Sequence, residues 1–261
     1  RARARVLRAA RSPLIFFRVE THARLESTND RALALAAGGC PEGTVVVASE
    51  QTGGRGRLGR RWHSPAGAGL WCSVVLRPTL PPDRLPALGL LGAVAAARAV
   101  RALYGIPVAL KWPNDLLAHG AKLGGVLCEM GGGSCVVGIG VNVNLDRDAF
   151  PPELRATATS ISAETGRAGD PGALLARVLE EAGALYAELA VRGETDTLLA
   201  AWAGLASPTG TAMRVRHATG ELEGTVAGVA PDGALLLRTA GGTVERIHAG
   251  DATILRGDST A

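Results

Sequence analysis

The sequence has 261 residues, of which 47% are hydrophobic and 20% charged, and its formal net charge is +4 at pH 7. This composition excludes a wholly disordered chain, and so small a net charge does not by itself indicate a nucleic-acid-binding protein. The four cysteines form no C-x-x-C pair, which argues against a zinc site and predicts reduced thiols in a cytoplasmic protein. No signal peptide is visible at the start. The longest nearly apolar run, residues 85–97, is interrupted by Pro and Gly and is too short to span a membrane.

The first half of the chain combines helix and strand signals after a basic start. Its Arg- and Ala-rich beginning predicts a mobile or helical tail, taken as residues 1–20. A helix is expected to begin at Ser27 or Thr28, either of which could be its N-cap, and to end at Gly38-Gly39. Further elements follow in chain order: a strand at 44–49, a Gly- and Arg-rich loop at 53–61, a strand at 69–77 and a buried helix at 83–104.

The second half predicts a β-meander, two helices and a small β-rich domain. The expected strands are 108–112, 122–130 and 135–144. A helix should begin with Pro171 at its first position and run to about residue 190, and a shorter helix should hold Trp202. From residue 207 the chain changes to short β segments separated by Gly turns, which predicts a separate small barrel at 207–261 after a larger domain at 21–206.

The sequence GRGRLG at 54–59 matches G-x-G-x-x-G, but its surroundings exclude the enzyme classes that use this pattern. A dinucleotide-binding fold needs a helix directly after the loop, whereas Pro65 and a strand follow here. The H-R-D and D-F-G motifs of kinases and the P-loop motif do not occur in the sequence. Arginines in a flexible loop can pair with phosphate or carboxylate oxygens, and Trp62 offers a face on which a purine could stack. Taken alone, the loop could equally be a solvated basic hairpin.

Three further motifs bring lysines, glycines and asparagines near this loop. KWPND at 111–115 and KLGG at 122–125 each begin with a lysine, and GVNVN at 140–144 ends an apolar strand with two asparagines. Paired glycines weaken a strand and indicate the close approach of a ligand. A buried asparagine needs hydrogen-bond partners, some of which a ligand could supply. Each motif alone has a structural explanation as a turn or a bulge, but their joint occurrence favours a binding site.

This set of motifs resembles the biotin–protein ligase family, in its order and spacing. The motifs are ESTND (26–30), EQTGGRGRLGRRWHSP (50–65), GLWCSVVLRP (69–78), KWPNDLL (111–117), KLGGVLCEM (122–130) and GIGVNVN (138–144). The resemblance implies an α+β fold, with a mixed β-sheet catalytic domain flanked by helices and a small C-terminal SH3-like β-barrel. The chain is most similar to the monofunctional members, which lack an N-terminal DNA-binding domain, so no specific DNA binding is expected.

The resemblance also implies roles for individual residues. Biotin would be bound by Ser27, Thr28, Asn29, Gln51, Arg55, Gly56, Arg57, Lys122 and Gly125. ATP would be bound by Arg57, Arg60, Trp62, Lys111, Asn114, Asp115 and Asn142. Lys122 and Arg57 would be the catalytic cations, and Asp115 would contact the metal, Mg²⁺. The second loop that covers the adenylate should fall within 144–158, where no residues are assigned.

By resemblance, biotin is activated by ATP to biotinyl-5'-AMP and then transferred to a specific lysine of a biotin carboxyl carrier protein of a biotin-dependent carboxylase. The residue types suit this chemistry, because a carboxylate is already ionised at pH 7 and needs no general base. Lys122, the loop arginines and Mg²⁺ would neutralise charge as two anions meet. Because glycine and like charges disfavour a fixed loop, we expect residues 53–61 to stay mobile until ligands bind.

Two other functions remain open at this point. One is a lipoate or octanoate ligase of the same fold, and the other is a non-catalytic module that binds biotin or, through its basic tail and barrel, nucleic acid. Pairing of edge strands could form a homodimer, although nothing in the pattern demands it.

Overall fold

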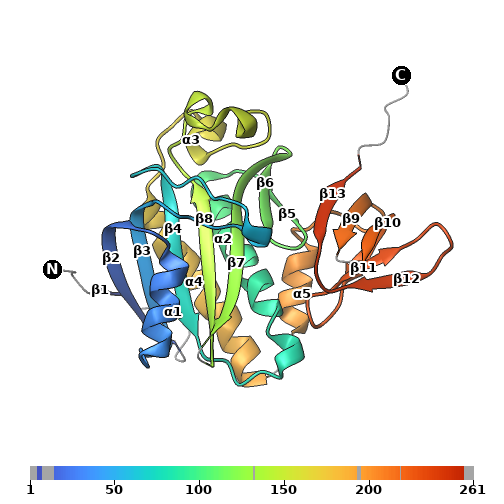
Figure 1. Cartoon of the computed structure of the whole chain (residues 1–261), viewed down its shortest axis with the longest axis horizontal. Helices are drawn as coiled ribbons and strands as arrows, with labels where there is room; N and C mark the ends of the chain where they lie inside the picture. Colours follow the sequence, from blue (N-terminus) through green and yellow to red (C-terminus); the bar gives the residue numbers. More distant parts are fainter. Residues whose placement is uncertain (1–4, 8–14, 132, 193–194, 218, 256–261) are drawn as a thin grey trace.

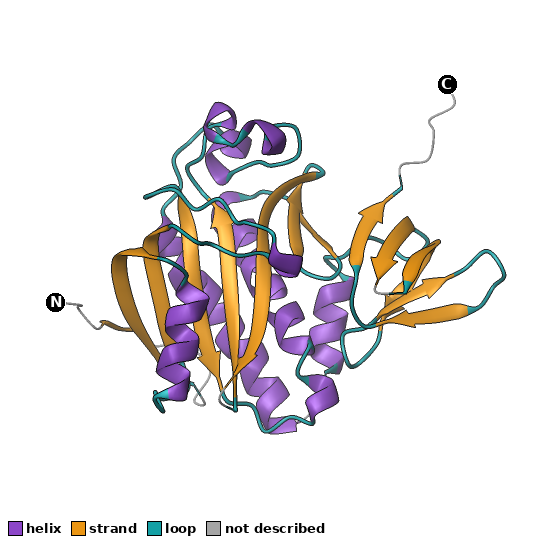
Figure 2. Cartoon of the chain, in the orientation of Figure 1, coloured by secondary structure: helices purple, strands orange, loops and turns teal. Residues whose placement is uncertain are grey.

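A computed structural model describes residues 5–7, 15–131, 133–192, 195–217 and 219–255. In this part of the chain the larger layer is an 8-stranded mixed sheet, in the order β1-β2-β3-β4-β8-β7-β6-β5 (Figures 1 and 2). β2 runs parallel to β3, and the other described pairs of the sheet are antiparallel. The strands are β1 (Arg5–Leu7), β2 (Phe17–Leu25), β3 (Thr44–Gln51), β4 (Gly69–Leu76), β5 (Val108–Lys111), β6 (Asp115–Ala118), β7 (Ala121–Gly131) and β8 (Ser134–Asn142).

Helices cover both faces of this sheet. α1 (Thr28–Ala37) lies over β3, β4 and β8, while α2 (Ala87–Tyr104) and α4 (Pro171–Arg192) pack on the opposite face (Figure 1). α5 (Asp196–Ala203) packs against α2 and α4, and the short α3 (Ile161–Thr165) lies beyond one end of the sheet. Because β4 is covered on both sides, every one of its residues is buried, as its continuous apolar sequence requires.

The helix boundaries largely follow the predicted signals. Ser27 is the N-cap of α1, and its side chain accepts a hydrogen bond from the backbone of Asp30. α2 ends at Gly105, which adopts the left-handed conformation with φ 70° that glycine favours. The start of α2 was predicted too early, because a separate 3-10 turn at Pro82–Arg84 comes first and the α-helix begins after Pro86.

The apolar α2 is the central helix of the core. By length and composition alone, the stretch Pro82–Tyr104 could cross a membrane, but 67% of its apolar window is buried inside the protein. Small side chains make this burial possible, since six of the seven alanines of α2 are fully buried and the helix packs against the sheet and α4. The core helix of a globular protein therefore accounts for this apolar stretch.

The structure differs from the sequence-based expectation at two places in the large sheet. β2 begins at Phe17 and β1 pairs with it, so part of the segment 1–20 belongs to the sheet and not to a tail; the other residues up to 14 lie outside the described part. Polar residues alternate with Phe17 and Val19, which hid this half-buried strand among charged neighbours. β6 begins at Asp115, the last residue of the turn predicted at 113–115, and with four residues is too short to recognise from sequence.

The C-terminal region forms a second, 5-stranded antiparallel sheet, in the order β12-β11-β10-β9-β13. Its strands are β9 (Ala212–His217), β10 (Gly220–Val229), β11 (Leu235–Arg238), β12 (Val244–Ile247) and β13 (Asp251–Ile254). The α+β class is confirmed, but among the described strands no ladder joins β12 to β13, so the predicted SH3-like barrel is not closed. The predicted division into domains at residues 206 and 207 stays a prediction.

Backbone and side-chain contacts attach this second sheet to the large one. The buried Trp112 donates a hydrogen bond from Nε1 to the carbonyl oxygen of Gly233, at 3.0 Å. Leu110 exchanges backbone hydrogen bonds with the chain that enters the second sheet, through Leu205 and Ser207. β5 and the KWPND turn that follows it therefore also set the position of the C-terminal sheet.

Replacing Trp112 with Phe should lower the free energy of unfolding by about 1–3 kcal/mol, because the Gly233 carbonyl loses its donor in a buried place. Urea denaturation measures this change. An unchanged midpoint and slope would show that the Trp112 contact does not hold the two sheets together.

Candidate active site

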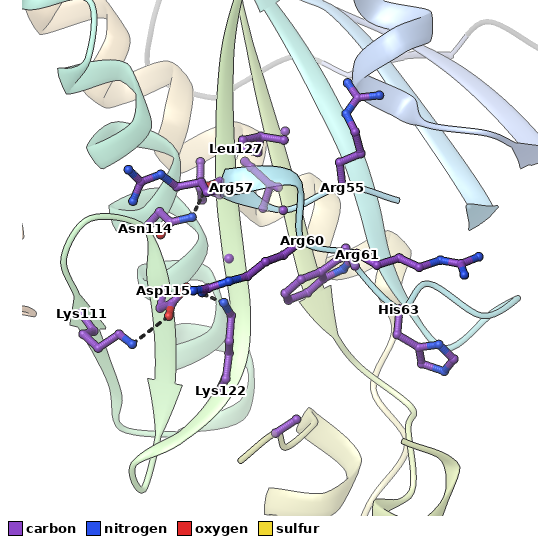
Figure 3. A pocket seen from close by; sticks show the side chains of 18 of the residues that line it. Arg55, Arg57, Arg60, Arg61, His63, Lys111, Asn114, Asp115, Lys122 and Leu127 are labelled. Carbon is purple, nitrogen blue, oxygen red and sulfur yellow. Dashed lines mark hydrogen bonds and ion pairs between the residues drawn. The ribbon is translucent and has the colours of Figure 1, made fainter. Parts of the chain in front are cut away.

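A cavity of about 630 Å³ opens above the ends of β7 and β8. Its walls come from the start of α1, the end of β3, the arginine loop (residues 54–61), the KWPND turn, β7, β8, the segment 150–158 and β13. The sheet order explains this meeting, since β4, β8, β7 and β6 are neighbours, so the first part of β7 and the last part of β8 lie side by side. Figure 3 shows the charged side chains around the cavity.

Every residue that the sequence predicted for the site lines this one cavity. They are Ser27, Thr28, Asn29, Gln51, Arg55, Gly56, Arg57, Arg60, Trp62, Lys111, Asn114, Asp115, Lys122, Gly125 and Asn142. The structure therefore brings the predicted set together, while the role of each residue stays a prediction.

One end of the cavity is a buried, hydrogen-bonded group of uncharged polar side chains. Thr28 donates to Gln51 Oε1 from its backbone nitrogen and its hydroxyl, at 2.9 and 3.0 Å. Ser73 Oγ lies 2.6 Å from Asn29 Oδ1 and 2.8 Å from Thr28 Oγ1. Gln51 donates in turn to Ser64, at 3.0 Å. These contacts fix the side chains in advance, so this end suits a neutral polar group of a ligand.

Two carboxylates hold Arg55 at the entrance of the arginine loop. Arg55 donates to Asp30 Oδ2 at 2.5 Å and to Glu129 Oε2 at 3.1 Å. The hydrogen bond to Asp30, together with the charge of Glu129, raises the pKa of Arg55 above its usual range, against the effect of burial. Glu129 also accepts from Asn29 Nδ2 at 2.6 Å. The loop is thus tied through Glu129 to the polar end of the cavity.

The opposite end of the cavity is a cluster of cations around Asp115. Lys122 Nζ lies 2.5 Å from Asp115 Oδ1, and Lys111 Nζ lies 3.1 Å from Oδ2 (Figure 3). Lys122 also stands over the ring of Trp62, 5.5 Å from its centroid. Figure 3 shows Arg60 directed toward this cluster. Such a concentration of positive charge suits phosphate oxygens.

Asn114 and Asn142 shape the walls of this end, because their side chains donate hydrogen bonds to backbone carbonyls. Asn114 donates from Nδ2 to the Val126 carbonyl at 2.7 Å, and Asn142 donates to the Thr159 carbonyl at 2.9 Å. The backbone of Lys122 bonds to Thr157 and Thr159. The segment after β8 is therefore fixed beside Lys122.

Asp115 is a hard oxygen donor of the kind that Mg²⁺ accepts, usually as one of one or two carboxylates beside substrate phosphates. Among the described residues no group of three or more His, Cys, Asp or Glu side chains could hold a metal ion. One carboxylate fits a Mg²⁺ ion whose other oxygen ligands come from nucleotide phosphates and water, and the predicted contact with Asp115 remains a prediction.

Glycines on β7 and β8 form the floor of the cavity. Gly125 lies opposite Gly140 in the ladder, and a Cβ atom at Gly140 would come within 2.8 Å of Trp62 Nε1. That Nε1 atom is buried and has no hydrogen-bond partner within the described part of the chain. The indole therefore rests on the floor with a free donor.

Some residues of the site were not predicted from the sequence. They are Asp30, Ser73, Glu129, Gly138, Gly140, Gly250 and Asp251. Ser73 gave a usable signal, because a serine within an apolar and fully buried strand needs a partner. Glu129 and Asp251 gave none, because their partners are distant in sequence.

Three carboxylates outside the arginine loop form ion pairs with its arginines, and such pairs oppose the expected mobility of the loop. Asp30 and Glu129 neutralise Arg55, and Asp251 pairs with Arg60. Opposite charges from other elements therefore offset the repulsion among the loop arginines, and the mobility of the loop without ligands stays a prediction.

The chain matches the model of the Biotin/lipoate A/B protein ligase family over residues 22–146 and that of the Biotin protein ligase C terminal domain over residues 212–254. It is 40% identical over 232 residues to a bifunctional ligase/repressor of Bacillus spizizenii, covering 87% of this chain and 71% of the relative. It is 37% identical over 230 residues to a biotin–[acetyl-CoA-carboxylase] ligase of Paracoccus denitrificans, covering 84% and 94%. A solved biotin protein ligase of Aquifex aeolicus, in complex with biotin and ATP, aligns with a TM-score of 0.80 at 29% identity, covering 92% and 99%.

Replacing Gly140 with Ala should destabilise the protein by about 1–3 kcal/mol, because the added methyl group must displace the indole of Trp62. Gly125→Ala is the matched control, since the nearest atoms to its Cβ would be 3.6 Å away. Calorimetry should give a lower melting temperature for the Gly140 variant only. Equal losses in both variants would contradict the packing of Trp62 on this floor.

Proposed function

The chain belongs to the biotin protein ligase family, and from that premise we propose how its own residues carry out ATP-dependent biotin ligation. The enzyme activates biotin with ATP and transfers it to a lysine of an acceptor protein. One observation supports placing biotin and ATP at different ends of the cavity. One end is neutral and polar, the other is cationic, and the arginine loop joins them. A neutral ring system with a carboxylate tail would fit along this gradient, with its carboxylate toward Lys122.

The polar end is the proposed biotin site. Here Ser27, Thr28, Asn29 and Gln51 present amide and hydroxyl groups, and Gly125 lies on the floor. Neutral donors and acceptors that are already fixed can bind a neutral polar ring without the cost of ordering side chains. Arg55 and Gly56 would close the site as the start of the loop, and Arg57 and Lys122 would face the carboxylate.

The cationic end is the proposed nucleotide site. Lys111, Asp115 and Arg60 would surround the phosphates, with Arg57 and Lys122 at the reacting phosphate. Trp62 would stack on the adenine, while Asn114 and Asn142 support the walls. Mg²⁺, held by Asp115 and the phosphates, would supply further charge neutralisation when bound.

The first reaction joins two anions, so its barrier depends on charge. A carboxylate oxygen of biotin attacks the α-phosphorus, and the bond from phosphorus to the bridging oxygen of pyrophosphate breaks. Charge moves onto the phosphate oxygens and the leaving pyrophosphate, where fixed cations stabilise it. Lys122 is anchored by Asp115 at 2.5 Å and is therefore the proposed central cation.

In the second reaction a neutral lysine amine attacks the acyl carbon, AMP leaves with the electrons of the broken anhydride bond, and the nitrogen loses one proton to water or to the leaving phosphate to give the amide. The cations of the cavity repel an ammonium group and therefore favour the neutral amine. We propose that the acceptor is a biotin carboxyl carrier protein of a biotin-dependent carboxylase, because the relative in Paracoccus denitrificans is named for acetyl-CoA carboxylase.

Other expectations remain proposals of the same kind. Free cysteines suit a cytoplasmic enzyme. Sequence-specific DNA binding is not expected and would be detected by a gel shift with operator DNA. A homodimer through edge strands stays open, and sedimentation equilibrium would detect it.

The test of this function is exchange of labelled pyrophosphate into ATP with biotin, lipoate or octanoate supplied separately with Mg²⁺. Biotin alone should support exchange. Exchange with lipoate or octanoate instead would keep the fold and overturn the substrate, and exchange with none would favour a binding module without catalysis.

Lys122→Ala should lower the rate of biotin-dependent exchange by roughly 10²–10³-fold, because it removes a fixed cation from the transition state. Lys122 is partly exposed, so the unfolding temperature should change little. A near-normal exchange rate in a folded variant would contradict the role of Lys122.

A further inference from the structure

The arginine loop is attached to the C-terminal sheet by two contacts. Arg57 donates from Nη1 to the carbonyl oxygen of Gly250 at 3.0 Å, and Arg60 forms an ion pair with Asp251. Asp251 is the first residue of β13, the strand of the C-terminal sheet nearest to the cavity (Figure 1). Both acceptors also line the cavity itself. The loop therefore bridges the two sheets above the cationic end.

The position of these two acceptors is fixed within the C-terminal sheet. Asp251 pairs with Arg216 in the ladder between β13 and β9. A Cβ atom at Gly250 would stand 2.8 Å from the Arg216 carbonyl oxygen and 2.8 Å from a methyl carbon of Val215. Only glycine lets the chain pass so close to β9, and this close passage sets where the Gly250 carbonyl and the Asp251 carboxylate meet the loop.

The ion pair is too exposed to contribute much to folding. The side chain of Arg60 is 61% exposed and that of Asp251 is 35% exposed. Exposed pairs contribute about 0–1 kcal/mol to stability. A contact that contributes so little to stability can still decide where a glycine-rich loop lies, because glycine leaves the loop backbone free to adopt several conformations.

The charges around Asp251 favour its ionised form. The hydrogen bond from Arg60 lowers the pKa of Asp251 despite partial burial, and the charges of Arg60, Lys111 and Arg57 act in the same direction. Burial lowers the pKa of Arg57, while the carboxylates of Asp251 and Asp115 oppose that change. Asp251 thus offsets part of the positive charge of the loop arginines from the C-terminal sheet, as Asp115 does from the large sheet.

We propose that Asp251 is a positioning residue for adenylation, which with the Gly250 carbonyl holds the arginine loop closed over the nucleotide end of the cavity. It acts through Arg60 and does not touch the reacting atoms. This inference rests on the proposed function of the cavity. It gives the C-terminal sheet a role in the first reaction, namely to favour the closed position of the loop, so that less of the ATP binding free energy is needed to order it.

The kinetic consequence is a change in KM for ATP with little change in kcat. In Asp251→Ala, part of the ATP binding free energy must order the loop, so KM for ATP in biotin-dependent exchange should rise roughly tenfold. At saturating ATP the loop is closed again, and kcat should stay within about twofold of the original enzyme. Asp251→Glu can restore the ion pair and should return KM close to its original value.

The matched control is Glu223→Ala. Glu223 on β10 forms an exposed ion pair with Arg214 on β9 of the same sheet and does not line the cavity. Glu223→Ala removes one negative charge from an exposed ion pair, as Asp251→Ala does, but KM for ATP and kcat should not change.

Two further measurements separate positioning from direct contact. Adding Asp251→Ala to Arg60→Gln should change KM no further, because the two residues act as one unit. In the absence of ligands, trypsin should cleave the loop of Asp251→Ala several-fold faster than the loop of Glu223→Ala, because released arginines are accessible.

Three results would overturn the proposal. A lower KM for ATP in Asp251→Ala would mean that Asp251 competes with the phosphates for Arg60. A further rise of KM in the Arg60→Gln background would mean that Asp251 contacts the nucleotide itself. Equal trypsin cleavage of the loop in the Asp251 and Glu223 variants would mean that the contact does not order the loop. The trypsin comparison needs no activity, so it decides this inference even if biotin supports no exchange.

Discussion

Carboxylates that face cations across the cavity are the interaction on which the rest of the site depends. The loop arginines and the two motif lysines would repel one another if they were brought together alone. Carboxylates from four elements hold most of them instead. Arg55 pairs with Asp30 at the start of α1 and with Glu129 on β7. Both lysines pair with Asp115 on β6, and Arg60 pairs with Asp251 on β13. The cations are thereby fixed in advance where a phosphate would develop charge, which is the condition for electrostatic catalysis.

The fold supplies these carboxylates because the large sheet places sequence-distant strands side by side. β8 lies between β4 and β7, so the polar end beneath α1 and the cationic end beside β6 share one glycine floor. Trp112 attaches the C-terminal sheet to the strand that carries Lys111. The edge strand β13 consequently reaches the loop from outside the large sheet. The contact between Trp112 and the C-terminal sheet thus helps to set the position of the arginine loop.

The sequence predicted the parts of the site that are encoded locally. Ser27 caps α1, KWPND lies at the turn between β5 and β6, and KLGG lies on the neighbouring β7, so short patterns were sufficient to find them. Contacts between distant residues could not be found in this way: Arg55 meets Glu129 across 74 positions, and Arg60 meets Asp251 across 191. β2 was missed because its polar alternation resembles an exposed segment, and the open form of the C-terminal sheet depends on pairing that no local pattern specifies.

The most direct test is a crystal structure with a stable analogue of biotinyl-adenylate, in which a non-reactive linkage replaces the mixed anhydride. The account predicts that the ring of biotin meets Thr28 and Gln51, and that Lys122 and Arg57 lie within hydrogen-bond distance of the phosphate. Arg55 should keep its contacts with Asp30 and Glu129. A phosphate bound away from Lys122, or a loop turned out of the cavity in the complex, would contradict the claim that carboxylates place these cations for catalysis.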